Sequence, residues 1–430
     1  MINQIYNKAG LPIDKLYFQD TLLYSNDVYG IEYDRTIAAP EVTRIGNMTL
    51  HAALPVQSKM RRCLLLDDGT VNYYLDANDS TLKDDGVTAA VLDGTDGQVM
   101  VEIPSYWRKF EVAGNINRAL FSENYFPGAH FVPKMYVSAY KAALKRTGNI
   151  LSSVLNITAE YRGGNNSATN DANAATLLGK PATAISRDNF RIYAQNRGED
   201  WFDMDYQVRK SVFWLITCEY ATRNHQSAID NTLTVEGYRK GCLGNGPTDI
   251  SSSDWSTFNG YYPLYECGLT NSLGNNTGEA PVVLQDFPTA GLTKATQSNS
   301  YRGIENFFGD LWEWTNGVNI EVGAVAAEVF IPDNFGLKFS GNLAIDSGYV
   351  NDILFGKDGD ILPVNTAGGS STTYFSDYYY QNFASKGTRG LLFGGHASHG
   401  SNAGSACAYS YLAPSSTSAY LGSRLCFFTR

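Results

Sequence analysis

Between Gly390 and Ser423 the chain has no lysine, arginine, aspartate or glutamate, although 18% of its 430 residues are charged. An uncharged stretch is either a core segment or a recognition surface. Core segments are rich in valine, isoleucine, leucine and phenylalanine, and residues 396–420 contain one leucine and none of the other three. Serine and glycine for adaptable hydrogen bonds, with tyrosine for rigid contact area, are typical of antibody binding sites. The composition therefore predicts an exposed binding face.

Other absences exclude whole classes of protein. The formal net charge is −10, whereas nucleic acids and anionic membranes are bound through concentrated lysine and arginine. No run approaches the ~20 apolar residues of a membrane-spanning helix. The N-terminus also lacks the basic and apolar regions of a signal peptide. We therefore expect no nucleic acid binding, no membrane insertion, and synthesis in a cytoplasm.

Patterns that bind metals or form disulfide frameworks are also missing. The six cysteines lie at positions 63, 218, 242, 267, 407 and 426, without a Cys-x-x-Cys pair or a zinc spacing. Free, buried thiols are favoured over disulfides. His396 and His399 are the only histidines close together in sequence, and no carboxylate stands near them to complete a metal site. We expect no metal ion and no other cofactor.

Catalytic motifs are absent as well. The chain has no nucleophile elbow, no His-Glu-x-x-His and no glycine-rich dinucleotide motif after a strand. Glu313, between Trp312 and Trp314, has two interpretations. Desolvation would raise its pKa and make it a general acid, or it is a buried carboxylate with hydrogen-bond partners and a structural role. The second is favoured, and we predict no catalytic residue and no enzyme.

Local patterns divide the chain near residue 126. Up to residue 125 the sequence is typical of strands and tight turns, with a hairpin around residues 67–69 and a strand at 98–103. Two helices are predicted further on, one capped by Ser186 and one at 206–223 with a single apolar stripe. Residues 224–300 show little periodicity. We predict a β-rich attachment or oligomerisation region at 1–125 and a ligand-binding domain at 126–430.

A short aromatic segment resembles a known family. The sequence FGDLWEWTNG at 308–317 is similar to the Gly-Asn-x-Trp-Glu-Trp signature of the formylglycine-generating-enzyme branch of the C-type lectin fold. In that family an arginine, a Gly-Gly turn and a closing strand follow, and residues 388–390, 394–395 and 422–425 stand here in that order. The resemblance covers about residues 126–430. It implies an α+β fold: a C-terminal C-type lectin domain with two helices and irregular long loops, preceded by a β-rich N-terminal region.

Two kinds of protein share that fold. Catalytic members hold a copper ion between two cysteines beside the Gly-Gly turn, where this chain has His-Ala-Ser-His-Gly, and this departure argues against an oxidase. The variable proteins of diversity-generating retroelements, among them the phage major tropism determinant, instead carry a C-terminal segment rewritten at template adenines. Residues 393–424 resemble such a variable segment, since Lys, Gln, Glu, Met and Trp are all absent from 393–420.

In a variable segment the exchangeable side chains point outward and the others hold the backbone. The predicted ligand-binding residues are His396, Ala397, Ser398, His399, Tyr409, Tyr411, Leu412, Thr417, Ser418 and Tyr420. The predicted backbone-holding residues are Gly400, Asn402, Ala403, Gly404, Gly422 and Arg424. The three tyrosines are expected to contribute most of the binding energy. The alternative is that they pack inward, because strands alternate faces and the sequence leaves the register open.

Three functions follow from these observations. The first is a phage tail receptor-binding protein or adhesin, located in the virion and made in the host cytoplasm. Its partners would be a host-surface protein or glycan and other tail proteins, and weak single sites favour a homotrimer. The second is a purely structural tail protein, and the third an oxidase of the formylglycine-generating type. We favour the first.

Overall fold

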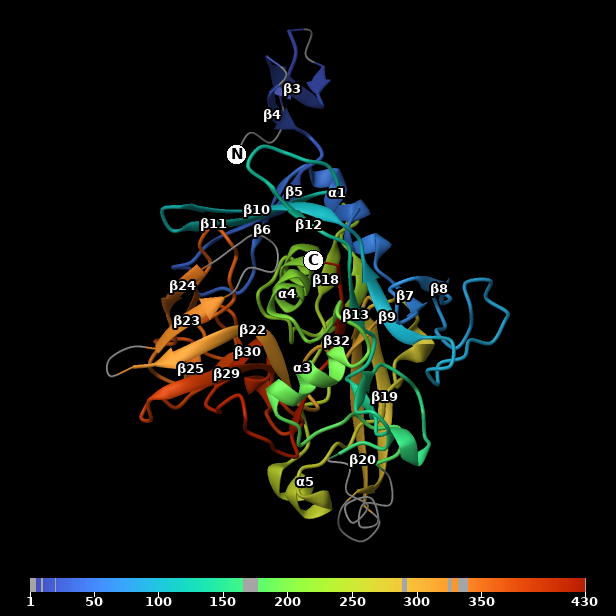
Figure 1. Cartoon of the computed structure of the whole chain (residues 1–430). Helices are drawn as coiled ribbons and strands as arrows, with labels where there is room; N and C mark the ends of the chain where they lie inside the picture. Colours follow the sequence, from blue (N-terminus) through green and yellow to red (C-terminus); the bar gives the residue numbers. More distant parts are fainter. Residues whose placement is uncertain are drawn as a thin grey trace.

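Strands dominate the architecture of this protein. The computed structural model describes residues 5–8, 11–19, 21–164, 177–287, 292–323, 327–331 and 339–429. Strands account for 38% of the structure and helices for 13%, and strands occur throughout the chain (Figure 1). The predicted α+β class is therefore wrong: the whole chain is β-rich, with only a few helices.

The fold-class prediction failed mainly at residues 224–300, which were expected to be long loops. They form strands β17 (Ile229–Leu233), β18 (Arg239–Gly241), β19 (Gly278–Phe287) and β20 (Leu292–Tyr301) and helix α5 (Ser252–Asn259). β19 and β20 pair antiparallel in one long hairpin (Figure 1). The sequence of β20, LTKATQSNSY, is mostly polar, so it shows no alternation of apolar and polar residues that would indicate a strand.

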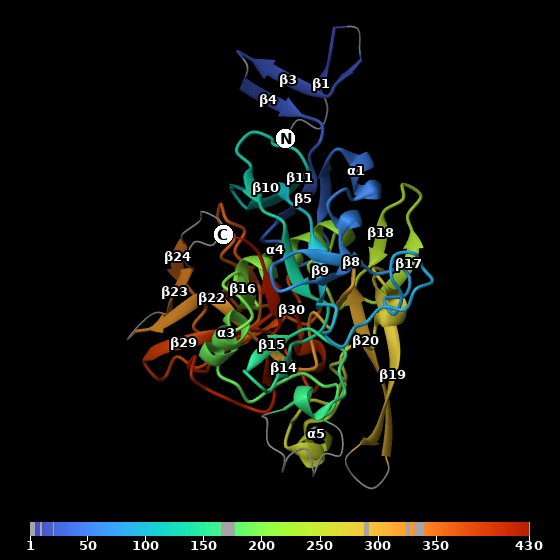
Figure 2. The ribbon, with the colours of Figure 1, turned by 45° about the vertical axis from the view of Figure 1, so that its right-hand side comes forward.

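An antiparallel five-stranded sheet lies near the N-terminal end, in the order β12-β10-β11-β5-β6. Its strands are β5 (Tyr29–Asp34), β6 (Thr43–Gly46), β10 (Tyr106–Ala113), β11 (Ile116–Ser122) and β12 (His130–Val132). Two hairpins precede it, formed by β1 (Ile5–Tyr6), β2 (Pro12–Ile13), β3 (Lys15–Phe18) and β4 (Thr21–Ser25). Both views show β3 and β4 projecting from the body at one end and α5 lying at the other (Figure 1, Figure 2).

A six-stranded antiparallel sheet joins the two predicted regions, in the order β16-β32-β13-β9-β7-β8. The N-terminal region supplies β7 (Arg61–Leu65), β8 (Val71–Tyr74) and β9 (Gln98–Ile103). The C-terminal region supplies β13 (Met135–Ser138), β16 (Trp201–Asp203) and β32 (Leu425–Phe427). The hairpin predicted around residues 67–69 and the strand predicted at 98–103 are confirmed. One continuous sheet therefore spans the boundary that the sequence predicts near residue 126.

The eight-stranded sheet takes three of its strands wholly or partly from the uncharged segment. Its path is β24-β23-β22-β29-β30-β28-β25, with β31 beside β22. β28 and β30 run parallel, as do β22 and β31. Its strands are β22 (Trp312–Val322), β23 (Ala327–Ile331), β24 (Phe339–Asn342), β25 (Gly348–Tyr349), β28 (Tyr378–Gln381), β29 (Gly387–Gly394), β30 (Gly404–Ser410) and β31 (Leu421–Gly422). The remaining strands are β14 (Ala143–Lys145), β15 (Ile150–Ser152), β21 (Ile304–Glu305), β26 (Asp352–Ile353) and β27 (Pro363–Asn365).

Helix α4 (Tyr206–Tyr220) lies at the centre of the molecule (Figure 1). The sequence predicts one buried stripe, but every residue from Tyr206 to Glu219 is buried. Its polar side chains have partners on the surrounding elements: Arg108 of β10 donates to Ser211 Oγ at 2.9 Å, and Glu219 binds Arg302 at 2.7 Å. A helix covered on all sides is a core element, and α4 connects the layers around it.

The helix ends follow capping rules. The side chain of Ser186 accepts a backbone N–H in the first turn of α3 (Arg187–Gln195), as predicted. Helix α4 ends at Tyr220 rather than at residue 223, because Ala221 takes a left-handed φ of 53°. The remaining α-helix in the described residues is α1 (Met48–Ala53). None of the helices in the described ranges is long and apolar enough to cross a membrane.

Candidate ligand-binding surface

Aromatic rings cluster beside strands β22, β28 and β30. We call this cluster the aromatic surface, and its members are Trp312, Tyr349, Tyr378, Tyr380, His396, His399, Tyr409, Tyr411 and Tyr420. Centroid distances from 3.5 to 5.7 Å connect each ring to at least one other. Most of the members lie in the segment without charge, and the rest come from strands that pair with it or lie close to it.

Strand register places the central rings together. In β28, Tyr379 is buried while Tyr378 and Tyr380 on either side of it are partly exposed, as the two-residue period of a strand requires. The parallel pairing of β28 with β30 sets Tyr380 opposite Tyr409, and their ring centroids are 6.0 Å apart. Tyr409 also lies 5.2 Å from the ring of Trp312, which is buried. Two partly exposed tyrosines, Tyr380 and Tyr409, thus lie against a buried tryptophan.

Nine of the ten predicted ligand-binding residues reach the surface. Tyr411 and Thr417 are exposed, and seven are partly exposed: His396, Ser398, His399, Tyr409, Leu412, Ser418 and Tyr420. None of the three tyrosines is fully buried, but Tyr409 and Tyr420 pack partly inward against apolar core clusters, as the alternative expected. Ligand binding by these residues stays a prediction.

Ala397 is the exception, and the prediction that it belongs to the binding face is wrong. Its side chain is fully buried and packs with Ile250, Trp255 and Leu311 in a separate apolar cluster. Its backbone N–H donates to the carbonyl of Asp310 at 2.9 Å, and its own carbonyl accepts from Ile250 at 2.8 Å. These contacts turn the methyl group inward. A run of four small or polar residues has no periodicity that would reveal this orientation.

His396 and His399 form a compact turn after β29. Their rings stack with centroids 3.5 Å apart and planes 14° from parallel. The backbone N–H of His396 donates to Nδ1 of His399 at 3.0 Å, and the backbone N–H of Ser398 donates to Nδ1 of His396 at 3.3 Å. Burial lowers the pKa of His399 to about 4. Burial, with a contribution from His399, also holds the pKa of His396 well below its ordinary value. Both rings are therefore neutral at pH 7.

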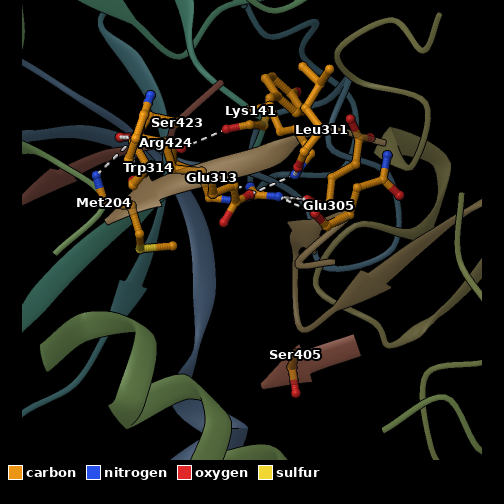
Figure 3. A network of polar contacts seen from close by, with 12 residues as sticks. Lys141, Met204, Glu305, Leu311, Glu313, Trp314, Ser405, Ser423 and Arg424 are labelled. Carbon is orange, nitrogen blue, oxygen red and sulfur yellow. Dashed lines mark hydrogen bonds and ion pairs between the residues drawn. The ribbon is translucent and has the colours of Figure 1, made fainter. Parts of the chain in front are cut away.

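Glu313 is the centre of a buried ion cluster (Figure 3). Its carboxylate binds Lys141 Nζ at 2.7 Å, Arg209 Nη1 at 2.6 Å and Arg424 Nε at 2.6 Å. Burial raises the pKa of Glu313, but Arg424, Lys141 and Arg209 outweigh burial, and the pKa lies below its ordinary value. The structural interpretation of Glu313 is thus confirmed. The carboxylate is ionised and fully paired, whereas a general acid would need a raised pKa.

Two cations of this cluster also bind distant backbone segments. Arg424 donates to the carbonyls of Glu305 and Asn306, the latter at 2.6 Å (Figure 3). Arg209 of α4 donates to the carbonyl of Ser405, at the start of β30, at 2.9 Å. One cluster therefore joins β22, α4, β30 and the segment before β32. Nε of Arg209 is buried without a hydrogen-bond partner, but the other contacts of this network tie four segments together. A buried network of this kind makes its surroundings rigid, and the aromatic surface lies on that rigid base.

Side chains that could bind a metal ion are scattered rather than clustered. Within the described ranges, no group of three or more His, Cys, Asp or Glu side chains is arranged to hold a metal ion. All six cysteines are free and buried, which confirms the prediction for the thiols.

Sequence reasoning missed part of the surface. Tyr349, Tyr378 and Tyr380 belong to it, although they lie far before the uncharged segment in the chain. Trp255 and Tyr261, from the stretch expected to be irregular, border it, with ring centroids 5.2 Å from His396 and 6.2 Å from Tyr420 respectively. The tyrosine-rich run at 374–380 was the available signal. Only the parallel pairing of β28 with β30 shows where that run lies.

Comparison with known proteins gives only weak similarities. No family model matches the chain, and no curated protein does. A structure of PvdO from Pseudomonas aeruginosa is similar with a TM-score of 0.35 and 11% identity, covering 79% of this chain and 98% of that one. A Major Tropism Determinant P3c variant is similar with a TM-score of 0.26 and 17% identity, covering 68% of this chain and 50% of that one. At these TM-scores neither similarity establishes the fold or the function of this chain.

Proposed function

We propose that this protein is a receptor-binding protein of a phage tail and that its aromatic surface binds a ligand on the host cell. One observation carries the proposal. Partly exposed tyrosines and histidines gather at one place on the largest sheet, within and beside a segment that has no charged side chain. Tyrosine supplies a large contact area at little cost in conformational entropy. Aromatic residues also dominate the binding energy of many interfaces.

The rigid base supports this role. Glu313 and its three cations are buried, and all three cations also bind backbone carbonyls. A surface that is already ordered loses less conformational entropy when it binds a partner. Exposed side chains such as Tyr411 and Thr417 can be exchanged without creating a cavity, since the large cost of core substitutions of about 2–5 kcal/mol does not apply to them. The surface is therefore suited to variation in its ligand.

The proposal assigns contact with the phage tail to the end of the molecule opposite α5, the helix that borders the aromatic surface (Figure 1). The β3–β4 hairpin projects there (Figure 2) and exposes Leu16, Tyr17 and Phe18. Consecutive exposed apolar residues on a strand point to both faces of the hairpin, and such residues are suited to contacts with tail proteins or with further copies of the chain. A homotrimer would present three aromatic surfaces at once, and linked weak sites gain about 10²–10⁴ in apparent affinity.

Attachment of the purified full-length protein to a panel of bacterial strains tests the proposal. The double variant Tyr409→Ala/Tyr411→Ala is expected to attach at least about tenfold more weakly, since interface tyrosines often contribute more than about 1 kcal/mol each. Tyr125→Ala is the matched control. Tyr125 is 49% exposed, similar to 45% for Tyr411, but it packs on Trp107 of the five-stranded sheet. The control is expected to attach like the wild type.

Each alternative function predicts a different result in these experiments. A wild type that attaches to no strain would support a purely structural tail protein. A tyrosine variant that attaches as well as the wild type would remove the aromatic surface from the proposal. Consumption of oxygen with a cysteine-containing peptide, after loading with copper, would favour the oxidase.

A further inference from the structure

The hydrogen bonds of His396 and His399 determine where each ring carries its hydrogen. In both rings Nδ1 lies in the path of a backbone N–H, at 3.0 Å for His399 and 3.3 Å for His396. A backbone N–H can only donate, so Nδ1 must accept and carries no hydrogen. A neutral imidazole with a bare Nδ1 carries its hydrogen on Nε2. Each ring of the stacked pair is therefore an Nε2–H donor.

The two Nε2–H groups are free to bind something outside the protein. Within the described ranges, the hydrogen bonds of both rings are made at Nδ1. Neither Nε2 is among the buried polar atoms that lack a partner. An atom that has no protein partner and is not buried reaches solvent. The pair thus presents two donors to the outside from rings stacked 3.5 Å apart.

Aromatic side chains hold the pair in this orientation. Trp255 of α5 lies 5.2 Å from the His396 ring, and Trp312 and Tyr380 each lie 5.2 Å from the His399 ring, between centroids. In the described part of the chain neither ring makes an ion pair or a hydrogen bond with a charged side chain. The donors are therefore both oriented and uncharged.

We infer that the stacked pair binds one carbonyl oxygen of a polypeptide ligand, an inference that rests on the receptor-binding function proposed above. A carbonyl oxygen has two lone pairs and can accept both Nε2–H groups at once. An anionic group fits less well, because the segment has no cation to balance it and the chain has a net charge of −10. Tyrosine-rich surroundings are typical of surfaces that bind proteins, which favours a polypeptide over a glycan.

The same geometry opposes a metal ion at this pair. A metal would bind the lone pair of Nε2, so the hydrogen would have to move to Nδ1. Nδ1 would then face the backbone N–H groups of His396 and Ser398 as a second donor, and both hydrogen bonds of the turn would be lost. Long-range ¹H–¹⁵N NMR of the histidine rings at pH 7 tests the arrangement directly. We expect the Nε2–H form for both rings, unchanged by added Zn²⁺; an Nδ1–H form in either ring would overturn the inference.

Paired substitutions test the donors in attachment. Asparagine at position 396 or 399 retains an acceptor oxygen near the place of Nδ1 but ends before the place of Nε2. Glutamine extends an N–H donor to the place of Nε2. We expect His396→Asn and His399→Asn each to weaken attachment about three- to tenfold, and His396→Gln and His399→Gln to restore part of that loss. Equal effects of asparagine and glutamine would overturn the donor role.

Protease treatment of the cells identifies the class of ligand. Cells of a strain that binds the wild type are treated with proteinase K before the assay, and loss of attachment is expected. Attachment that survives the protease but is lost after periodate oxidation of glycans would overturn the polypeptide ligand. If wild-type protein attaches to treated and untreated cells and the histidine variants attach equally well, the inference fails while the proposed function stands. If no strain binds the wild type, both fail.

Discussion

The carboxylate of Asp377 fills the space beside Gly404 where any other residue would place its side chain. A Cβ at Gly404 would lie 1.7 Å from Oδ1 of Asp377, and Gly404 has a φ of +139°. The other oxygen of Asp377 accepts the backbone N–H of Ala406 at 2.6 Å. A glycine and a buried acid thus fix the start of β30, the strand that carries Tyr409.

Gly404→Ala is expected to destabilise the protein by at least about 3 kcal/mol, because it adds both a clash and an unfavourable backbone conformation. Gly400→Ala is the control. Gly400 has a φ of +52°, but no atom lies within 4 Å of the place that an added methyl group would take, so only the conformational cost of about 1–2 kcal/mol applies. Urea unfolding measures the loss of stability in both variants. Equal losses would show that Asp377 moves aside without cost.

Glu313→Gln is expected to cost about 3–5 kcal/mol at pH 7, because it leaves three buried cations without their counter-ion. Lys59→Met is the control, since Lys59 forms an exposed ion pair with Glu123 and exposed pairs contribute about 0–1 kcal/mol.

The difference between wild type and Glu313→Gln should shrink in acid. The pKa of Glu313 is lowered in the folded state. Its ionisation therefore stabilises the fold above the ordinary glutamate pKa of about 4.3, and that contribution is lost as the pH falls through the folded-state pKa. Urea unfolding between pH 3 and pH 7 checks this. A difference that does not change with pH would contradict the assignment.

Asp203→Asn is expected to stabilise the protein at neutral pH. Both carboxylate oxygens of Asp203 are buried without a hydrogen-bond partner, and burial raises the pKa of this group well above its ordinary value. Folding must then take up a proton at pH values above about 3.9, so stability falls as the pH rises toward the folded-state pKa, by up to about 1.4 kcal/mol per pH unit.

Thermal unfolding between pH 5 and pH 8 measures this effect. The advantage of Asp203→Asn should grow with pH. Asp205→Asn is the control, because Asp205 caps helix α4 and an anion at a helix N-terminus is favourable; this variant should not gain stability. A wild type as stable as Asp203→Asn at every pH would show that Asp203 has a partner.

Ala397→Asp is expected to destabilise the protein by about 3 kcal/mol or more, since it buries a charge in an apolar cluster. Thr417→Asp, at an exposed position of the same segment, should change the free energy of unfolding by less than about 0.5 kcal/mol. Chemical unfolding of both variants checks this contrast. Equal tolerance at the two positions would restore Ala397 to the set of exchangeable residues.

Local signals predicted the local structure of this chain well. A turn motif at residues 67–69 marked the β7–β8 hairpin, Ser186 marked the start of α3, and apolar spacing marked α4. The position of Glu313 between two tryptophans indicated a buried, paired carboxylate. Each of these inferences depends on residues within a few positions of one another.

Features that depend on distant contacts could not be predicted in this way. The polar sequence of β20 forms a strand because β19 pairs with it. Tyr380 joins the aromatic surface because β28 runs parallel to β30, a pairing between strands that are not adjacent in sequence. The burial of Ala397 depends on Ile250 and Trp255, about 150 residues earlier. A large part of the aromatic surface therefore could not be predicted from the uncharged segment alone.

The six-stranded sheet has a mechanical consequence. Its strands β7 and β9 come from before the predicted boundary and β13, β16 and β32 from after it, and β32 begins one residue after Arg424. In the proposed function, tension between the projecting hairpin and a bound cell would pass through laterally bonded strands rather than through a single linker. Strands that are hydrogen-bonded side by side bear such a load together, whereas a single linker between two domains would bear it alone.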